Sequence, residues 1–148
     1  MTNWTQKDVI SFLSQMKLFE NLPDNVPQTL AEKVIISQFS DRATVLKRGQ
    51  GGNSLYIVAA GQVKVTLDSP KGKQEVSVLD AGEFFGEIAM MTQARRTATV
   101  TAIGDTIVLE CLANDILPLA DKHPDLKKRI VRVGAKRSQD SLSRLIDS

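Results

Sequence analysis

The chain contains few of the residues that bind metals or form disulfides. It has one cysteine and one histidine in 148 residues. A single cysteine cannot form an intrachain disulfide, and a single histidine cannot supply a multi-histidine metal site. No paired nucleophile and base is visible either. The sequence therefore predicts a protein that is not an enzyme and has no metal or cofactor. Cys111, inside an apolar segment, is expected in the core.

The chain also lacks a long apolar run. No stretch approaches the roughly 20 residues that span a membrane, and the polar N-terminus has no apolar core of a signal peptide. Hydrophobic residues make up 42% and charged residues 24% of the chain, as in ordinary globular proteins. We expect one domain without membrane contact, located in the cytoplasm.

Excess charge of either sign is small, with a net charge of +2, and aromatic residues make up only 5%. Cations nevertheless gather near the C-terminus, at Lys127, Lys128, Arg129, Arg132, Lys136 and Arg137. A solvated helix face often carries such a run, and the aromatic residues that stack on single-stranded nucleic acid are missing. The sequence therefore does not favour a nucleic-acid partner.

Short segments rich in β-branched residues and separated by Gly, Asp, Asn or Pro fill the middle of the chain. They are 44–46, 55–58, 62–67, 75–79, 97–102 and 106–111. Val63, Val65 and Leu67 alternate with polar residues, as in a strand with one buried face. The connections are too short for crossover helices. The predicted fold class is mainly β with flanking α: an antiparallel β-roll, or jelly-roll-like barrel, with N-terminal helices and a C-terminal hinged helix.

Helical periodicity flanks these strands. Thr5 is a plausible N-cap for a first helix, and Leu30, Val34 and Ile35 continue the helical spacing after a proline-containing turn. A short helix is predicted over 115–122, and Pro124 opens a longer one that Gly134 and the polar run after it weaken. We expect one domain over 1–148, with a helical part at 1–40, a β-roll at 41–112 and C-terminal helices at 113–148.

Residues 85–100 carry the groups that could hold a ribose-bearing phosphate. Gly86 permits a close backbone approach, and Glu87 can accept a hydrogen bond from a sugar hydroxyl. A short apolar turn follows, whose free amides would attract an anion. Arg96 then supplies a permanent charge with forked donors, and Thr97 adds a hydroxyl.

This segment, Phe85-Gly86-Glu87 through Arg96-Thr97-Ala98, resembles the phosphate-binding cassette of the cyclic nucleotide-binding domain family. It is most similar to cassettes of cyclic-nucleotide-gated channels. Arg95 stands where many bacterial members have proline. Residues 46–49, 54–65 and 79–85 resemble the family's preceding strands and loops, so the likeness runs from about residue 18 to 146.

The resemblance implies a role for each matching residue. Glu87, with Gly86 close by, would bind the ribose 2′-hydroxyl, and Arg96 would bind the cyclic phosphate. The segment around them, Ile88, Ala89, Thr97 and Ala98, would add amides and a hydroxyl. The purine would pack on Val65 and Leu79, and Ser141 or Arg132 would reach its edge.

A switch follows from these implied roles. The last helix would close over the base and signal to an output domain or partner protein, and in the catabolite-activator branch it also forms a homodimer interface. The expected ligand is cAMP in preference to cGMP. Two alternatives remain: a ligand-free interaction domain, in which Glu87 pairs with Arg96 for structure alone, and a truncated cyclic-nucleotide-dependent transcription regulator. Because the chain stops inside a charged helical pattern, the sequence leaves open whether it is a fragment of a longer protein.

Overall fold

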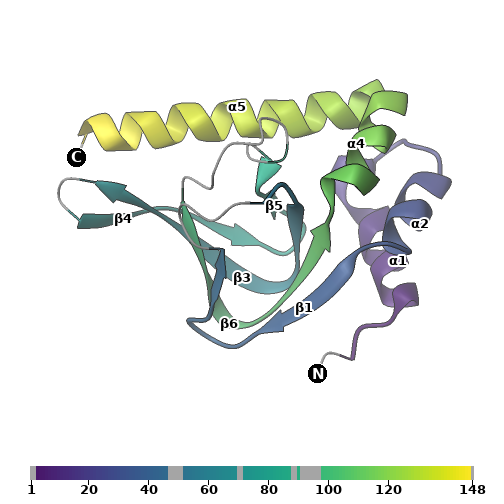
Figure 1. Ribbon diagram of the computed structural model, residues 1–148, viewed down its shortest axis with the longest axis horizontal. Helices are drawn as coiled ribbons and strands as arrows, with labels where there is room; N and C mark the ends of the chain where they lie inside the picture. The colour runs from purple at the N-terminus through teal and green to yellow at the C-terminus, as the bar shows by residue number, and fades with distance from the viewer. Residues whose placement is uncertain (1–2, 47–51, 70–71, 88–89, 91–97, 148) are drawn as a thin grey trace.

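The computed structural model describes residues 3–46, 52–69, 72–87, 90 and 98–147. Within these residues a helical N-terminal part precedes an antiparallel sheet, and two helices follow it (Figure 1). The N-terminal elements are α1 (Gln6–Gln15), the 3-10 turn η1 (Lys17–Phe19) and α2 (Asn25–Ala31). The C-terminal helices are α4 (Ala113–Lys122) and α5 (Pro124–Asp147).

In the described part of the chain, the sheet has six strands that all pair antiparallel. They are β1 (Ile35–Phe39), β2 (Thr44–Leu46), β3 (Leu55–Ser69), β4 (Gly72–Asp80), β5 (Phe84–Phe85) and β6 (Thr99–Cys111). The main order is β1-β6-β3-β4, with β2 on β6 and β5 on β3. The sheet curls on itself beneath α5 (Figure 1). The predicted fold class is confirmed.

Two long strands replace the pairs of short ones that the glycine positions predicted. β3 continues through Gly61, where the pairing with β6 shifts register, and β6 continues through Gly104. Gly61 has φ +78 and Gly104 has φ +68, a left-handed conformation that glycine adopts without steric cost. The glycines therefore make irregularities within the strands, and the sheet bends without ending.

The first strand was missed by the sequence pattern. Leu30, Val34 and Ile35 have helical spacing, but α2 ends at Ala31 and β1 begins at Ile35. The β-branched run that starts at Val34 pairs with the last strand, with Ile36 opposite Leu109. Long-range pairing thus outweighs the local helical pattern.

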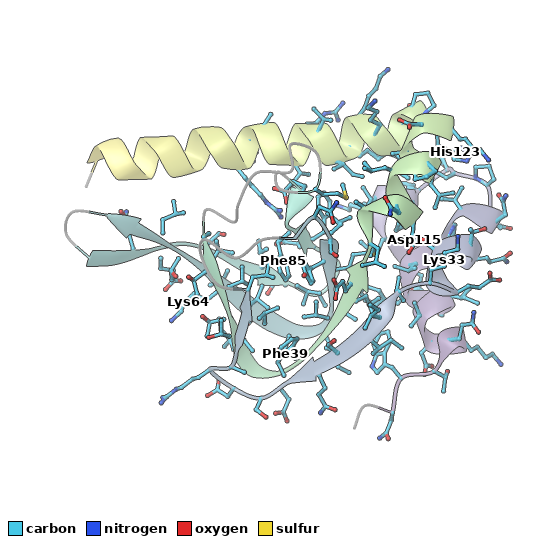
Figure 2. All side chains as sticks on the ribbon, in the orientation of Figure 1. Lys33, Phe39, Lys64, Phe85, Asp115 and His123 are labelled. Carbon is cyan, nitrogen blue, oxygen red and sulfur yellow. The ribbon has the colours of Figure 1, made fainter. Side chains whose placement is uncertain are left out.

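Two apolar clusters sit on opposite faces of β3, as its alternating side chains require. Ile57 and Ala59 pack with the helices, including Leu126 and Ile130 of α5. Val58 and Val63 face the inside of the curled sheet. Phe85 and the half-buried Phe39 belong to this inner cluster, within the roll (Figure 2).

Helix α5 is continuous over 24 residues, although Gly134 was expected to weaken it. It begins at Pro124 as predicted, and Leu126 and Ile130 are fully buried against the helical cluster. The Arg129 guanidinium donates to the Leu18 carbonyl oxygen at 2.9 Å, which ties α5 to η1. This burial fixes the N-terminal half of the helix against η1 and the helical cluster, and the C-terminal half extends over the sheet (Figure 1). In the described part of the chain, no helix is long and apolar enough to cross a membrane.

Candidate functional site

The short strand β5 positions the start of the predicted cassette. Its two aromatic side chains point to opposite faces: Phe84 packs in the helical cluster and Phe85 in the inner cluster. Phe85 also stacks on Tyr56, with ring centroids 5.2 Å apart and an interplanar angle of 11°. Anchored on both faces, β5 fixes the backbone that leads directly into Gly86.

Gly86 turns the chain from β5 into a helical backbone. Its φ is +87, a conformation that a residue with a Cβ rarely adopts. Glu87 then has helical backbone, and the Met90 amide donates to the Gly86 carbonyl oxygen at 3.1 Å. Met90 is 1% exposed in the helical cluster, which anchors this turn. Gly86 therefore forms a turn directly before Glu87, and the carboxylate stands at the first helical position after it.

Glu87 is a buried carboxylate with an ionic partner on α5. The residue is only 4% exposed, and its Oε2 accepts a hydrogen bond from Nη1 of Arg137 at 3.1 Å. The Arg137 guanidinium also lies over the Phe84 ring, 5.3 Å from the centroid. Removing a carboxylate from water is costly unless a charge or hydrogen bonds replace the water. Arg137 supplies that compensation from a position 50 residues away in sequence.

A groove opens beside this pair, between α5 and β4. Its volume is about 620 Å³. Apolar residues make up part of the lining: Leu18, Val78, Leu79, Phe84 and Val133. The charged lining residues are Lys17, Arg129, Arg132, Lys136 and Arg137, with Glu83 as the only carboxylate among the described residues that line it. An apolar wall with cations around it suits an anion that carries an apolar or aromatic body.

One helix face supplies most of these cations. Arg129, Val133, Lys136 and Arg137 recur at three- and four-residue spacings on α5, so they lie on one side of the helix. This is the cationic run that the sequence attributed to a solvated face. Part of it instead lines the groove, since Arg137 reaches into the fold to Glu87.

The structure brings several predicted site residues together. Val65 and Leu79 belong to the inner cluster on adjacent strands, where Val63 pairs with Leu79 and Val65 with Ser77. Leu79 also lines the groove, as does the exposed Arg132. Leu79 therefore connects the interior of the roll with the groove below α5.

Other predicted residues are only partly placed. Ala98 is half-buried just before β6. Ile88, Ala89, Arg96 and Thr97 lie outside the described residues, so the predicted phosphate contacts stay a prediction. Ser141 is on α5, and its side chain lies outside the described part. Within the described residues, no three histidine, cysteine or acidic side chains gather into a metal-binding group.

Sequence reasoning missed Arg137 as a site residue. It weighed Glu87 as a partner of Arg96, whereas the described partner is on the last helix. A signal was present, because a buried carboxylate needs a cation and α5 is rich in cations. The pairing itself depends on how α5 crosses the sheet, which local sequence does not specify.

Comparisons with known proteins place this geometry in a class. The crystal structure of the Thermus thermophilus catabolite activator protein matches with a TM-score of 0.75 at 24% identity, over 86% of this chain and 61% of that one. The regulatory domain of Toxoplasma gondii PKA, crystallised with cAMP, matches with a TM-score of 0.74 at 23% identity, over 91% and 50%. These likenesses show that the fold is that of catabolite-activator and PKA regulatory domains.

Sequence comparison then gives the family. Residues 36–123 match the cyclic nucleotide-binding domain family. A cGMP-dependent protein kinase of Eimeria tenella is 30% identical over 146 residues, which is 93% of this chain and 14% of the kinase. The chain belongs to the cyclic nucleotide-binding domain family. It spans between 9% and 14% of the length of four curated cGMP-dependent kinases that it resembles, and the catalytic parts of those kinases lie outside it.

Proposed function

We propose that this chain is a non-catalytic sensor that binds a cyclic mononucleotide, with cAMP favoured over cGMP. The observation that carries the proposal is the buried Glu87 at the glycine turn after β5, where the family resemblance puts the ribose contact. A Toxoplasma domain of the same fold was crystallised with cAMP, which supports this ligand class. The resemblance leaves the base open at Thr97, because in the family a hydroxyl at this position can bond the guanine of a syn nucleotide, and similar cassettes also take cAMP. We favour cAMP of the two.

We assign one group of residues to each part of the ligand: the ribose, the cyclic phosphate and the purine. Glu87 accepts from the ribose 2′-hydroxyl, and Arg96 pairs with the cyclic phosphate, assisted by Thr97 and the amide of Ala89. The purine packs against Val65 and Leu79. Support for this last step comes from the shared inner cluster of these two side chains and from the groove that reaches Leu79.

Helix α5 acts as the lid and the output. In this proposal Arg132 meets the base edge, with Ser141 as the second candidate, and the place of Arg132 in the groove lining supports this role. Closing α5 over the base changes the surface that a homodimer partner, an output domain or another protein contacts. The effect is limited to the difference in ligand affinity between the two helix positions. We place this sensor in the cytoplasm as one domain, with the helical part, β-roll and C-terminal helices divided near residues 40 and 112.

Ligand-dependent thermal unfolding tests the proposal. A nucleotide present at 100 times its dissociation constant stabilises the folded state by about 2.7 kcal/mol. We expect cAMP, and cGMP at higher concentration, to raise the unfolding temperature, whereas acyclic 5′-AMP leaves it unchanged. Equal shifts with all three nucleotides would contradict a cyclic-phosphate site.

The second candidate function is a ligand-free interaction domain. The ion pair between Glu87 and Arg137 favours it, because this pair satisfies the buried carboxylate without any ligand. In that case neither cyclic nucleotide changes the unfolding temperature. Replacing either partner of the pair would still destabilise the fold.

A further inference from the structure

A second cavity lies in the N-terminal helical part of the chain. It opens where the end of α1, the turn η1 and the start of α2 meet, and its volume is about 450 Å³. These elements stand at the opposite end of the molecule from the C-terminus of α5 (Figure 1). Of the described residues that line it, only Lys17 also lines the groove beside α5. The volume falls within the range of small-ligand pockets, about 300–1,000 Å³.

The floor of this cavity is apolar. Met16 and Phe19 line it and are only 4% and 3% exposed, because they belong to the helical cluster. Pro27 is buried as well, and Leu22 is half-buried against the same cluster. The alkyl stem of a long side chain, or a neighbouring apolar side chain, can pack on such a floor while its polar end stays at the rim.

Two carboxylates at the rim have no ionic partner among the described residues. Glu20 and Asp24 both line the cavity and are exposed. Asp24 stands at the N-cap position of α2, yet its side chain accepts no hydrogen bond from the helix. The backbone of Asp24 is itself helical, with φ −59 and ψ −27, whereas a capping side chain normally extends from a β-region residue. Both carboxylates are therefore available to a cation from outside.

The end of α1 adds negative charge to the same rim. Its last residue is Gln15, and its last turn contains no basic residue. In the described part of the chain, nothing donates a hydrogen bond to the carbonyl oxygens of Ser14 and Gln15. A helix C-terminus carries about half a negative charge. Lys17 is the only cation among the described lining residues, so the cavity is opposite in sign to the groove beside α5.

We propose that this cavity docks a basic segment of a partner protein by taking one of its arginine side chains. The planar guanidinium has five donors, enough to meet the two carboxylates and the free carbonyl oxygens of α1 together. Its alkyl stem packs on Met16 and Phe19, and an apolar neighbour in the segment covers Leu22. An acidic segment would instead meet Glu20 and Asp24 as like charges. The contact needs no nucleotide, so it is independent of the function proposed above.

Two matched peptides test the charge requirement. Amide NMR spectra of the intact chain are titrated at low salt, without nucleotide, with acetyl-Leu-Arg-Leu-amide and with its citrulline counterpart. Citrulline keeps the length and shape of arginine but is neutral. The same titrations use Glu20→Gln, Asp24→Asn and the control Glu32→Gln. Glu32 is an exposed carboxylate at the other end of α2 that does not line the cavity.

We expect saturable shifts at the end of α1 and in η1, with the arginine peptide bound about fivefold or more tightly than the citrulline peptide. Glu20→Gln and Asp24→Asn should each weaken the arginine peptide about two- to fivefold, as for loss of one exposed ion pair. Glu32→Gln should leave its affinity unchanged. Equal affinities of the two peptides, shifts confined to other parts of the chain, or no binding would overturn the proposal.

An added cation tests the same site from the protein side. Gln15→Lys supplies the charge that the last turn of α1 lacks, so it should raise the unfolding temperature and compete with the arginine peptide. Gln28→Lys adds the same charge at an exposed position of α2 outside the cavity and should leave peptide affinity nearly unchanged. Equal peptide affinities of the two variants would place the peptide elsewhere and overturn the proposal.

Discussion

Glu87 and Arg137 form an ion pair of 3.1 Å between the turn after β5 and the middle of α5. The two residues are 50 positions apart, and the carboxylate is buried. The pair joins the segment that resembles a phosphate-binding cassette to the helix that the family resemblance makes the mobile output. The structure therefore connects the start of this segment to α5 through one buried ion pair.

Removing the carboxylate should destabilise the ligand-free protein. Glu87→Ala leaves the guanidinium of Arg137, mostly shielded from water, without its ionic partner. We expect a loss of about 1–3 kcal/mol in the free energy of unfolding, measured by urea denaturation. Glu83→Ala removes an exposed carboxylate nearby and should stay within about 0.5 kcal/mol. Equal effects of the two changes would contradict the buried pair.

Removing the phosphate contact should affect binding much more than folding. Arg96→Ala is expected to cost about 2–5 kcal/mol of cAMP binding, as for one partner of a desolvated charge pair. At about 1.4 kcal/mol per tenfold, this is at least an order of magnitude in affinity, measured by competition with a fluorescent cyclic nucleotide. Glu87→Ala should weaken binding less, because the phosphate keeps its cation. Unchanged affinity in Arg96→Ala would place the phosphate elsewhere.

The irregularity in β3 should tolerate no side chain at Gly61. A Cβ there would lie against the Asp105 carbonyl oxygen and 2.8 Å from Oγ1 of the fully buried Thr106. Gly61→Ala combines a left-handed conformation, about 1–2 kcal/mol, with overpacking of about 1–3 kcal/mol.

Gly104 provides the matched control, because it has φ +68 but nothing within 4 Å of an added Cβ. Gly104→Ala should therefore show only the conformational cost of about 1–2 kcal/mol. Thermal unfolding of both variants measures the difference. Similar unfolding temperatures would mean that the close contact at Gly61 relaxes freely.

The single thiol should be unreactive in the folded protein. Burial, with smaller contributions from Asp115 and Glu110, raises the pKa of Cys111 from 9.0 to about 12. Alkylation by iodoacetamide at pH 8 should be slow in buffer and fast in urea, because the thiolate is the reactive form. Equal alkylation rates in buffer and in urea would show that the C-terminal end of β6, where Cys111 lies, opens readily in the folded protein.

The same shift predicts a pH dependence of stability. The folded state retains the thiol proton more tightly than the unfolded state, so the unfolded state binds fewer protons between pH 9.0 and about 12. The free energy of unfolding should fall as pH rises through this window. Cys111→Ala lacks this contribution, and the fall measured in urea should be smaller in that variant. Parallel pH curves for the two proteins would contradict the shift.

Local signals predicted the parts of the fold that depend on neighbouring residues. Thr5 caps α1 in a reciprocal capping box with Asp8, and Pro124 opens α5. The strand at 44–46 lies where its β-branched residues and flanking turns indicated. Each of these features is determined within a few residues, so sequence reasoning could find it.

The features that were missed depend on long-range contacts. Leu30, Val34 and Ile35 have helical spacing, yet β1 begins at Ile35 and its place is set by pairing with β6. The sequence pattern ended a strand at Gly61. The structure continues β3 through it, because Thr106 packs closely against the Gly61 backbone, a contact that local sequence does not specify. Arg137 was counted with solvated cations, because only the crossing of α5 over β5 brings it to Glu87. The motif predicted the site residues, whereas the contact of Glu87 with Arg137 on α5 came only from the structure.

Calorimetric titration of the purified chain with cAMP, beside cGMP and 5′-AMP, tests the central claim most directly. The account predicts saturable binding of about one cyclic nucleotide per chain, tighter for cAMP than for cGMP, and no heat with 5′-AMP. Absence of binding by both cyclic nucleotides would contradict the sensor and leave Glu87 and Arg137 as a structural pair in a ligand-free interaction domain.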